Sequence, residues 1–253
     1  MSNSKVQFPA KEYSNVQKEW IGKEYIVTPS ILNILVDGGI IKDKNVIDIG
    51  CGNGHYSNDM LKWEAKSVHG IDQSIEMINK AKNTYTKKGL TFECISTLDM
   101  KYEEIYDVAV AFFVMEFNQT IDDLFKSFKN IQKCLKKGGK FISIIPNGIQ
   151  NYNSTKEEGQ KFGASWEINL STKRYDGERL KINFYNKNGE VIGNSPVTFY
   201  FNETYINAAL SVGFTSVEFK NVIISEDGIK KYGKEFFNSF INPPKIVFLI
   251  ETN

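Results

Sequence analysis

Glycines alternate along the segment "IGCGNGH", at Gly50, Gly52 and Gly54, directly after the apolar run "VIDI". A glycine-rich turn between a strand and a helix can bring backbone N–H groups against a ligand, and the helix N-terminus favours negative charge. A tight turn that binds nothing would fit two glycines, but it fits three on alternate positions poorly. Asp48, two residues before the first glycine, adds a carboxylate at the expected strand end. We therefore interpret the segment as a ligand-binding loop.

The register of the glycines indicates the class of ligand. In the dinucleotide fingerprint GxGxxG the third glycine would fall at residue 55, which is His55. The pattern here is GxGxG, which argues against a nicotinamide cofactor and a dehydrogenase. A second acid, Asp72, lies 72 − 50 = 22 residues after Gly50, at the expected tip of the next strand. A carboxylate there can accept hydrogen bonds from both hydroxyls of a ribose, so we expect a ribose-bearing ligand.

Alternating strands and helices must position these residues. Apolar, β-branched runs predict strands at residues 45–49, 67–71, 90–95, 106–113 and 140–145. Helical patterns follow the first, second and fourth of these strands, at residues 55–65, 74–89 and 121–139. The helix at 74–89 would place Ile75, Ile78 and Ala81 on one face, and the helix at 121–139 would place Leu135 on its apolar face. Such alternation predicts a mostly parallel sheet covered on both faces.

The pattern changes after residue 150. Residues 150–200 are polar, aromatic and rich in turn formers, and residues 178–201 predict a β-hairpin that turns at Asn188-Gly189. A helix at 202–213 with Asn202 as its N-cap follows, and then a strand at 214–224. One or two short helices and a final strand complete the chain.

The composition limits the class of protein. The chain has 253 residues with a formal net charge of +1, so it lacks the global basic field that drives nucleic-acid binding. Its three cysteines have no close pair and fit a reducing compartment, and no cysteine–histidine cluster suggests a metal. No apolar run has signal-peptide or membrane-spanning character. We expect a cytoplasmic monomer or homodimer with no nucleic-acid, membrane or metal partner.

Three motifs together resemble a known family. "VIDIGCGNG", "GIDQSIEMINKAK" and "CLKKGGKFISIIPN" look like successive motifs of class I S-adenosylmethionine-dependent methyltransferases, over roughly residues 40–147. The resemblance implies S-adenosylmethionine as the cofactor, S-adenosylhomocysteine as the product, and no metal. The cofactor-binding residues that it implies are Tyr13, Asp48, Gly50, Cys51, Gly52, Asn53, Gly54, Asp72, Gln73, Met77, Thr97, Leu98, Phe112 and Phe113.

The resemblance also implies a role for each part of this set. The glycines would line the methionine part of the cofactor above Asp48, and Asp72 would hold the ribose. Gln73 and Met77 would flank the adenine, while the phenylalanines after the fourth strand would wall the transferring methyl. The N-terminal segment with Tyr13 belongs to a part that often closes over the cofactor in this family. The chain departs from the family near Ser96 and Thr97, where such enzymes often carry an acid that accepts from the adenine amine.

The resemblance extends, more weakly, over the C-terminal part. "YDGERLKINFYNKNGEVIGNSPVTFYF" and the following segments are similar to small-molecule methyltransferases of the toxoflavin synthase type, which methylate ring nitrogens. The expected fold is α/β and Rossmann-like. It comprises a mostly parallel seven-stranded sheet with helices on both faces, an antiparallel last strand and a small β-rich lid insertion. We expect a single domain over residues 1–253, with an N-terminal helical cap at 1–40 and a lid with the hairpin at 148–200.

Methyl transfer from a sulfonium is an in-line displacement with a good leaving group, so positioning and exclusion of water can supply most of the acceleration. A base is needed only when the nucleophile must lose a proton. Glu116, just beyond the fourth strand, is the candidate catalytic residue, because ligands bind beyond the carboxyl ends of such strands. A capping or solvated carboxylate is the alternative. His55 is expected near the cofactor's carboxylate, and His69 is expected to be a satisfied, partly buried histidine.

Aromatic residues in the insertion could line an apolar pocket for a flat acceptor, or they could form the insertion's own small core. These residues are Tyr152, Phe162, Trp166, Tyr175 and Tyr185. Enzymes that methylate exocyclic amines of bases commonly carry an Asn/Asp-Pro-Pro-aromatic run after the fourth strand, where this chain reads "FFVMEFN". The leading hypothesis is therefore methyl transfer to a nitrogen or oxygen of a small aromatic or heterocyclic molecule. The alternative is a non-catalytic module that keeps the cofactor fold.

Overall fold

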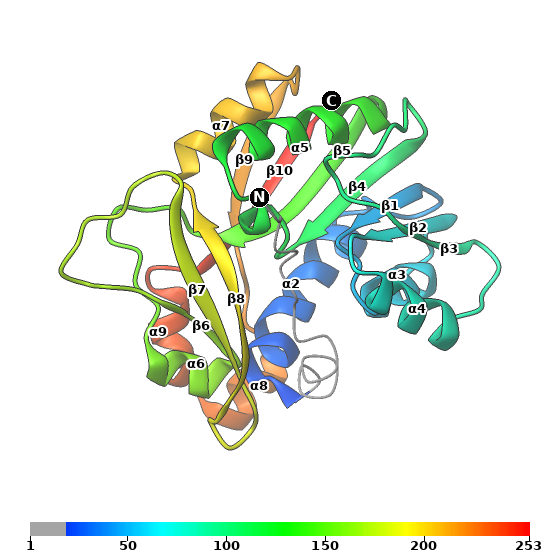
Figure 1. The fold of residues 1–253 in the computed structure, drawn as a ribbon. Coiled ribbons are helices and arrows are strands. Elements are labelled where there is room, and N and C mark those ends of the chain that lie inside the picture. Colours follow the sequence, from blue (N-terminus) through cyan, green and yellow to red (C-terminus); the bar gives the residue numbers. More distant parts are fainter. Residues whose placement is uncertain (1–18) are drawn as a thin grey trace.

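A seven-stranded sheet forms the centre of the computed structural model, which describes residues 19–253 (Figure 1). Its strand order is β3-β2-β1-β4-β5-β10-β9. β10 runs antiparallel to both of its neighbours, β5 on one side and β9 on the other. The predicted α/β fold with an antiparallel last strand is confirmed. The strands are β1 (Asn45–Ile49), β2 (Ser67–Asp72), β3 (Leu90–Cys94), β4 (Tyr106–Phe112), β5 (Leu135–Pro146), β9 (Ser216–Asn221) and β10 (Ile246–Thr252).

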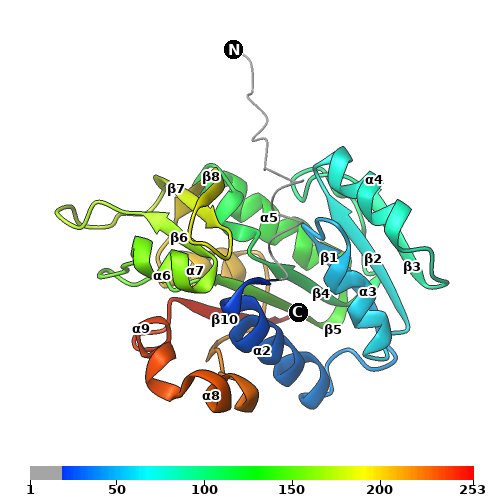
Figure 2. The same ribbon diagram turned by 90° about the horizontal axis from the view of Figure 1, so that it is seen from below.

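Helices cover both faces of this sheet (Figure 2). Because successive side chains of a strand point to opposite faces, Val46 joins the apolar cluster beneath one helical layer and Ile47 joins the cluster beneath the other. One layer contains α5 (Ile121–Cys134) and α7 (Asn202–Ser211). The opposite layer contains the continuous helical turns η2 (Lys23–Val27), α2 (Thr28–Leu32) and η3 (Asn33–Asp37), then α3 (His55–Lys62), α4 (Ile75–Thr84) and α8 (Glu226–Tyr232), followed by η5 (Lys234–Phe237) and α9 (Asn238–Ile241).

A second, three-stranded antiparallel sheet lies between β5 and α7 in the sequence. It consists of β6 (Ala164–Glu167), β7 (Glu178–Tyr185) and β8 (Val191–Phe199), preceded by α6 (Lys156–Phe162). The predicted hairpin is β7–β8. The sequence did not reveal β6, which is only four residues long, or α6, although Thr155 and Glu158 form a capping box at its start.

The small sheet is joined firmly to the N-terminal helical turns. Trp20 stacks on Phe184 with ring centroids 6.0 Å apart, and its indole Nε1 donates to the carbonyl of Tyr185 at 2.7 Å. Phe162 of α6 is buried in the cluster beneath the same helical layer. The insertion is therefore packed against the body of the protein at its α6 end.

Three local predictions were wrong. The helix predicted over 121–139 ends at Cys134, and Leu135 begins β5, because α5 and β5 are joined without a loop. Ile75 is 59% exposed at the start of α4, where Met77 takes the buried position. Asn202 is not the N-cap of α7: its side chain accepts from the backbone N–H of Gly148 at 2.8 Å and so holds the end of β5 to α7.

Candidate cofactor and acceptor site

The three alternating glycines all have positive φ angles, of +66°, +54° and +77°. A Cβ on Gly50 would lie 2.4 Å from Val114, and one on Gly54 would lie 2.6 Å from the ring of Phe92. A Cβ on Gly52 would meet nothing within 4 Å. The outer glycines are therefore fixed by protein neighbours, whereas Gly52 leaves its backbone bare toward open space. That is the arrangement a loop needs if a ligand is to approach its main chain.

Asp72 lies at the tip of β2 directly beside this loop. One carboxylate oxygen accepts from the N–H of Gly52 at 2.9 Å, and the other accepts from the N–H of Ser74 at 2.8 Å. Burial raises the pKa of this carboxyl, and the two backbone hydrogen bonds oppose that rise. Each oxygen of an ionised carboxylate can accept a second hydrogen bond. The carboxylate is thus fixed in orientation while keeping acceptor capacity for two ribose hydroxyls.

Asp48 is buried beneath the loop. Ser57 of α3 donates from Oγ to its Oδ2, so the first turn of α3 is bound to the end of β1. Burial raises the pKa of Asp48 to about 7, and the nearby charge of Asp72 adds to the rise. Beside it, the N–H of Cys51 donates to the carbonyl of Ile71 at 2.9 Å, which joins the loop to β2. Asn53 is half-buried in the turn that leads into α3.

A phenylalanine beneath the loop restricts two glycines at once. A Cβ on Gly70 of β2 would approach the ring of Phe92 to 2.7 Å and the Sγ of Cys51 to 2.9 Å. The same ring lies against Gly54, as described above. Phe92 of β3 therefore supports the loop and the neighbouring strand from one position.

The predicted adenine end is formed by the β2–α4 turn and the segment after β3. Gln73 is exposed, and Met77 is buried with its N–H bonded to the Oγ of Ser74. The carbonyl of Thr97 accepts from the amide of Asn130, and the N–H of Leu98 bonds to the Oγ of Ser96. Residues 96–98 thus offer hydroxyl and backbone groups at the position where the resemblance leads us to expect an acid.

Phe112 ends β4 and Phe113 follows it, and their role as a wall beside the transferring methyl stays a prediction. Phe113 has a φ of +59°, a conformation that residues with side chains rarely adopt and that turns the chain sharply after the strand. The ring of Phe112 meets the ring of Tyr56 edge-on, with centroids 5.5 Å apart. The strained turn sets the direction in which the following residues leave the sheet.

Two residues near Phe112, Tyr56 and Lys23, were not predicted from the sequence. The hydroxyl of Tyr56, on α3, lies 3.0 Å from Oγ1 of Thr28. The ammonium of Lys23 lies over the Tyr56 ring, 5.1 Å from its centroid. A cation is thereby held near the N-terminus of α3, where His55 also lies with its Nε2 3.5 Å from Asp59. No sequence signal placed Lys23 here, because it is one of many lysines and reaches α3 only through the fold.

Glu116 lies in the short helical turn η4 (Met115–Phe117), just past the strained residue Phe113. Its side chain is 2% exposed, and Oε2 has no hydrogen-bond partner within residues 19–253. Burial raises the pKa of Glu116 to about 8. The alternative of a solvated carboxylate is therefore wrong. The group is a desolvated carboxyl at the edge where ligands of such sheets bind.

The insertion aromatics divide into several groups. Tyr152 and Trp166 meet edge-on at 5.6 Å and form a small core that also contains Phe199. Tyr185 is buried with its hydroxyl 3.0 Å from the Oγ of Ser165. Phe162 belongs to the main core, as described above, and Tyr175 is 61% exposed. The interpretation as the insertion's own core thus holds for Tyr152 and Trp166, and their cluster includes Phe117, the residue after Glu116.

The remaining predictions concern Tyr13, a metal ion and a membrane. Tyr13 lies outside the described residues. Within residues 19–253 no group of three or more histidines, cysteines or acids could hold a metal ion, and no helix there is long and apolar enough to cross a membrane.

A family comparison decides the general identity of this site. Residues 40–188 match the family model described as a methyltransferase domain, which is more than half of the chain. The chain belongs to this methyltransferase family. The family and the fold identify S-adenosylmethionine as the cofactor.

Relatives of this methyltransferase differ in their named acceptors. It is 32% identical over 109 residues to a tRNA U34 carboxymethyltransferase of Campylobacter fetus, covering 42% of this chain and 38% of that protein. It is 29% identical over 173 residues to the ubiquinone biosynthesis O-methyltransferase of Coxiella burnetii, covering 64% and 70%. An S-adenosylmethionine-dependent methyltransferase structure from Clostridium acetobutylicum superposes with a TM-score of 0.60 at 18% identity, covering 96% of each chain. The chain thus spans about two fifths of the tRNA enzyme's length.

The residues of the methyltransferase fit its cofactor. The open backbone of Gly52 is hydrogen-bonded to the fixed carboxylate of Asp72 beyond the ends of β1 and β2, and the ammonium of Lys23 lies over Tyr56 at the start of α3. These groups match, in turn, a close-lying chain, a pair of hydroxyls and a carboxylate.

Proposed function

We propose that this methyltransferase transfers a methyl group to a nitrogen or oxygen of a small aromatic or heterocyclic molecule, as toxoflavin synthase-like enzymes do. The observation that carries the proposal is the buried carboxyl of Glu116, whose Oε2 has no hydrogen-bond partner within residues 19–253, beside the aromatic core of the insertion. A buried polar group without a partner is costly and needs an explanation, and a bound acceptor supplies one for Glu116 because this residue lies at the edge of the sheet where ligands bind. An apolar surround with one polar group suits a flat acceptor with few polar atoms.

The residues of the chain would act mainly by positioning. The bound cofactor supplies an electrophilic methyl group on a sulfonium. Gly52 and Asp72 hold the cofactor, and Phe112 and Phe113 confine the space beyond it. The three-stranded sheet acts as a lid that excludes water from the acceptor, which strengthens the remaining polar contacts. Glu116 orients the acceptor and takes its proton when the acceptor has one to lose.

A nucleic-acid acceptor is the second candidate function. It is favoured by the similarity to a protein named as a tRNA U34 carboxymethyltransferase, and by a partial match to an mRNA cap guanine-N(7) methyltransferase of Schizosaccharomyces pombe. The near-neutral net charge and the absence of an Asn/Asp-Pro-Pro-aromatic run in the sequence after β4 favour the small acceptor.

Two measurements separate the candidates. Calorimetry with S-adenosylhomocysteine should detect binding, and its absence at millimolar ligand would contradict the cofactor assignment. Transfer of labelled methyl from S-adenosylmethionine should then be assayed against a panel of heteroaromatic amines, ring nitrogens and phenols, and in parallel against total tRNA. Labelling of a small acceptor supports the proposal. Labelling of tRNA alone replaces it with the second candidate, and binding without turnover on either panel indicates a non-catalytic module.

The role of Glu116 is tested by Glu116→Gln. Because the pKa of this carboxyl is raised to about 8, its ionised fraction grows as the pH rises toward and past 8. For an acceptor that loses a proton, kcat/KM of the wild type should rise through this range. The variant should lack the rise and be about 100-fold slower at pH 8.5. Glu251→Gln, which changes a buried carboxyl in β10, is the control, and a Glu116→Gln enzyme with wild-type kcat/KM would exclude the role.

A further inference from the structure

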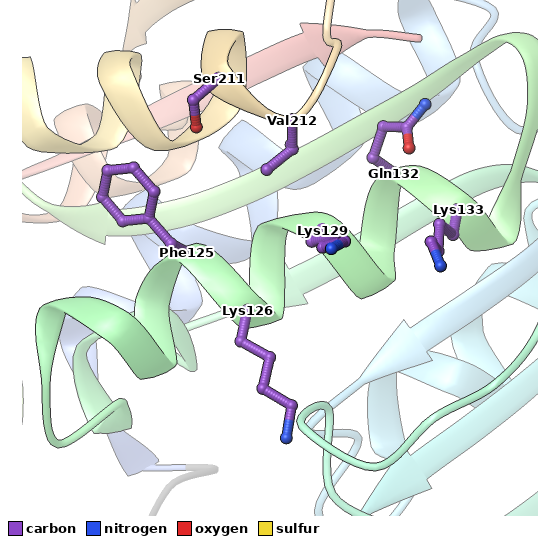
Figure 3. Close-up of a pocket in the computed structure, with 7 residues that line it drawn as sticks. All are labelled: Phe125, Lys126, Lys129, Gln132, Lys133, Ser211 and Val212. Atoms are coloured by element: carbon purple, nitrogen blue, oxygen red, sulfur yellow. The ribbon is translucent and has the colours of Figure 1, made fainter.

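A groove lies between α5 and α7, which cover the face of the sheet opposite α3 (Figure 3). Its volume is about 580 Å³. It is lined by Phe125, Lys126, Lys129, Gln132, Lys133, Ser211 and Val212. Neither the cofactor nor the acceptor chemistry uses these residues, so the groove needs a separate explanation.

Three lysines form a cationic row along one side of the groove. Lys126, Lys129 and Lys133 are exposed and follow each other at intervals of three and four residues, so they share one face of α5. They extend over about 10 Å along the helix axis at about 1.5 Å per residue. Within residues 19–253 none of the three lies within 4.0 Å of a carboxylate oxygen, whereas Lys136, just beyond the helix, pairs with Asp107 at 2.8 Å.

A second hollow of about 210 Å³ lies on the other side of this row. It is lined by Met100, Lys101, Tyr102, Glu103, Asn130 and Lys133. Lys133 lines both hollows, so the two meet at this end of the lysine row. Lys101 and Glu103, from the loop before β4, add one positive and one negative charge to this hollow.

The groove also offers apolar contact. Figure 3 shows Phe125 and Val212 on the α7 side of the lysine row, and both are half-buried. A partner helix lying in a groove between two helices buries apolar side chains against such residues and places polar ones at the rim. Lysines at intervals of three and four match carboxylates at i, i+4 and i+7 on an antiparallel helix.

A nucleic acid fits this surface less well than a protein does. Phe125 is the single aromatic residue lining the groove, whereas single-stranded nucleic acid is bound by successive stacking rings. Asp122 and Asp123 lie in the first turn of α5, between the lysine row and the candidate active site, and would repel a phosphate chain running toward that site.

We propose that the α5–α7 groove docks an acidic amphipathic helix of a partner protein, whose carboxylates pair with Lys126, Lys129 and Lys133 and whose apolar residues contact Phe125 and Val212. The docking surface is separate from the methyl-transfer site. A partner bound there would leave the carboxyl edge of the sheet open.

The test uses a labelled synthetic helix of 18 residues with glutamates at i, i+4 and i+7 and leucines on the adjacent face. Fluorescence anisotropy should show binding to the full-length protein, and the triple variant K126Q/K129Q/K133Q should weaken binding at least about tenfold. The matched control K82Q/K87Q/K88Q removes three exposed lysines elsewhere and should bind as the wild type does. The probe with glutamines in place of glutamates should bind the wild type as weakly as the glutamate probe binds the groove variant.

Three outcomes would overturn the proposal. Equal weakening of peptide binding in both triple variants would mean that binding depends only on the net charge of the protein. Tighter binding of a 12-nucleotide oligouridine, abolished by the groove variant alone, would make this a nucleic-acid surface. Loss of a dimer in sedimentation of the groove variant would assign the surface to a second copy of the chain.

Discussion

Single residues of the glycine loop carry different physical roles, although they look equivalent in the sequence. Gly50 and Gly54 must be glycine because Val114 and Phe92 occupy the space of a Cβ. Gly52 has a positive φ and open space beside it. We therefore expect the cofactor to contact the loop chiefly at its central glycine.

Gly52→Ala should weaken S-adenosylhomocysteine binding at least tenfold, because the new methyl projects into the space where the cofactor approaches. The positive φ also costs about 1–2 kcal/mol of stability. Gly138→Ala is the matched control, since Gly138 has a φ of +76° and equally open surroundings in β5. Calorimetry and thermal unfolding should show similar losses of Tm in the two variants but a change in Kd only for Gly52→Ala.

Lys23→Met should raise the Kd for S-adenosylhomocysteine about fivefold, the equivalent of about 1 kcal/mol for a partly exposed charge pair. The reason is the position of the Lys23 ammonium over Tyr56, near the N-terminus of α3. Methylthioadenosine lacks the methionine carboxylate and should bind the variant and the wild type alike. Equal weakening for both ligands would assign Lys23 a structural role instead.

Among the elements, those with a strong periodic pattern could be predicted from sequence. β1 matches its predicted bounds, and β2, β3 and β4 end within one residue of theirs, whereas α4 ends at Thr84, five residues before the predicted end at 89. The pattern could not reveal β6, because a four-residue strand is too short to show alternation. Nor could it place Asn202 correctly, because an asparagine before a helix has the same local sequence whether it caps that helix or holds a neighbouring strand.

In the candidate site, too, residues grouped by local motifs could be predicted and residues brought together by long-range packing could not. Asp48, Asp72 and the glycines are grouped by local motifs, so their neighbourhood could be predicted. The burial of Glu116 and the approach of Lys23 to Tyr56 depend on packing between segments far apart in the chain. Such contacts leave no periodic trace in a single sequence.

Asn202→Ala should lower the free energy of unfolding by about 1–3 kcal/mol, because the buried N–H of Gly148 loses its partner. Asn202→Ser distinguishes the bridge from a cap. Serine is a good N-cap, but it is too short to replace the amide that reaches Gly148, so it should be as destabilising as alanine in urea unfolding. A serine variant of wild-type stability would restore the capping interpretation.

At the scale of the whole molecule, buried acids should shape stability against pH. Glu251 is fully buried in β10, its oxygens have no partner within residues 19–253, and burial raises its pKa well above the ordinary range. Burial also raises the pKa values of Asp48 and Glu116. A folded protein that binds more protons than the unfolded chain loses stability as the pH rises. The free energy of unfolding should therefore fall from about pH 4.5 toward pH 8.

Glu251→Gln replaces one of these proton-binding carboxyls by an amide and keeps the size of the side chain. The variant should unfold at a Tm a few degrees above the wild type at pH 8, with a smaller gain at pH 4.5. The slope that remains comes from Asp48, Asp72 and Glu116, whose pKa values are also raised. A Tm gain that does not change with pH would show that the carboxyl of Glu251 does not bind an extra proton in the folded state.

The position of Phe92 has a consequence for how relatives of this protein diverge. One ring excludes a side chain at Gly54 and at Gly70, which belong to different motifs. Substitutions at Gly54, Gly70 and Phe92 are therefore expected to occur together in evolution rather than independently. Sequences with alanine at the position of Gly70 should carry a smaller residue in place of Phe92, and an alignment of many relatives would reveal this as covariation between β2 and β3.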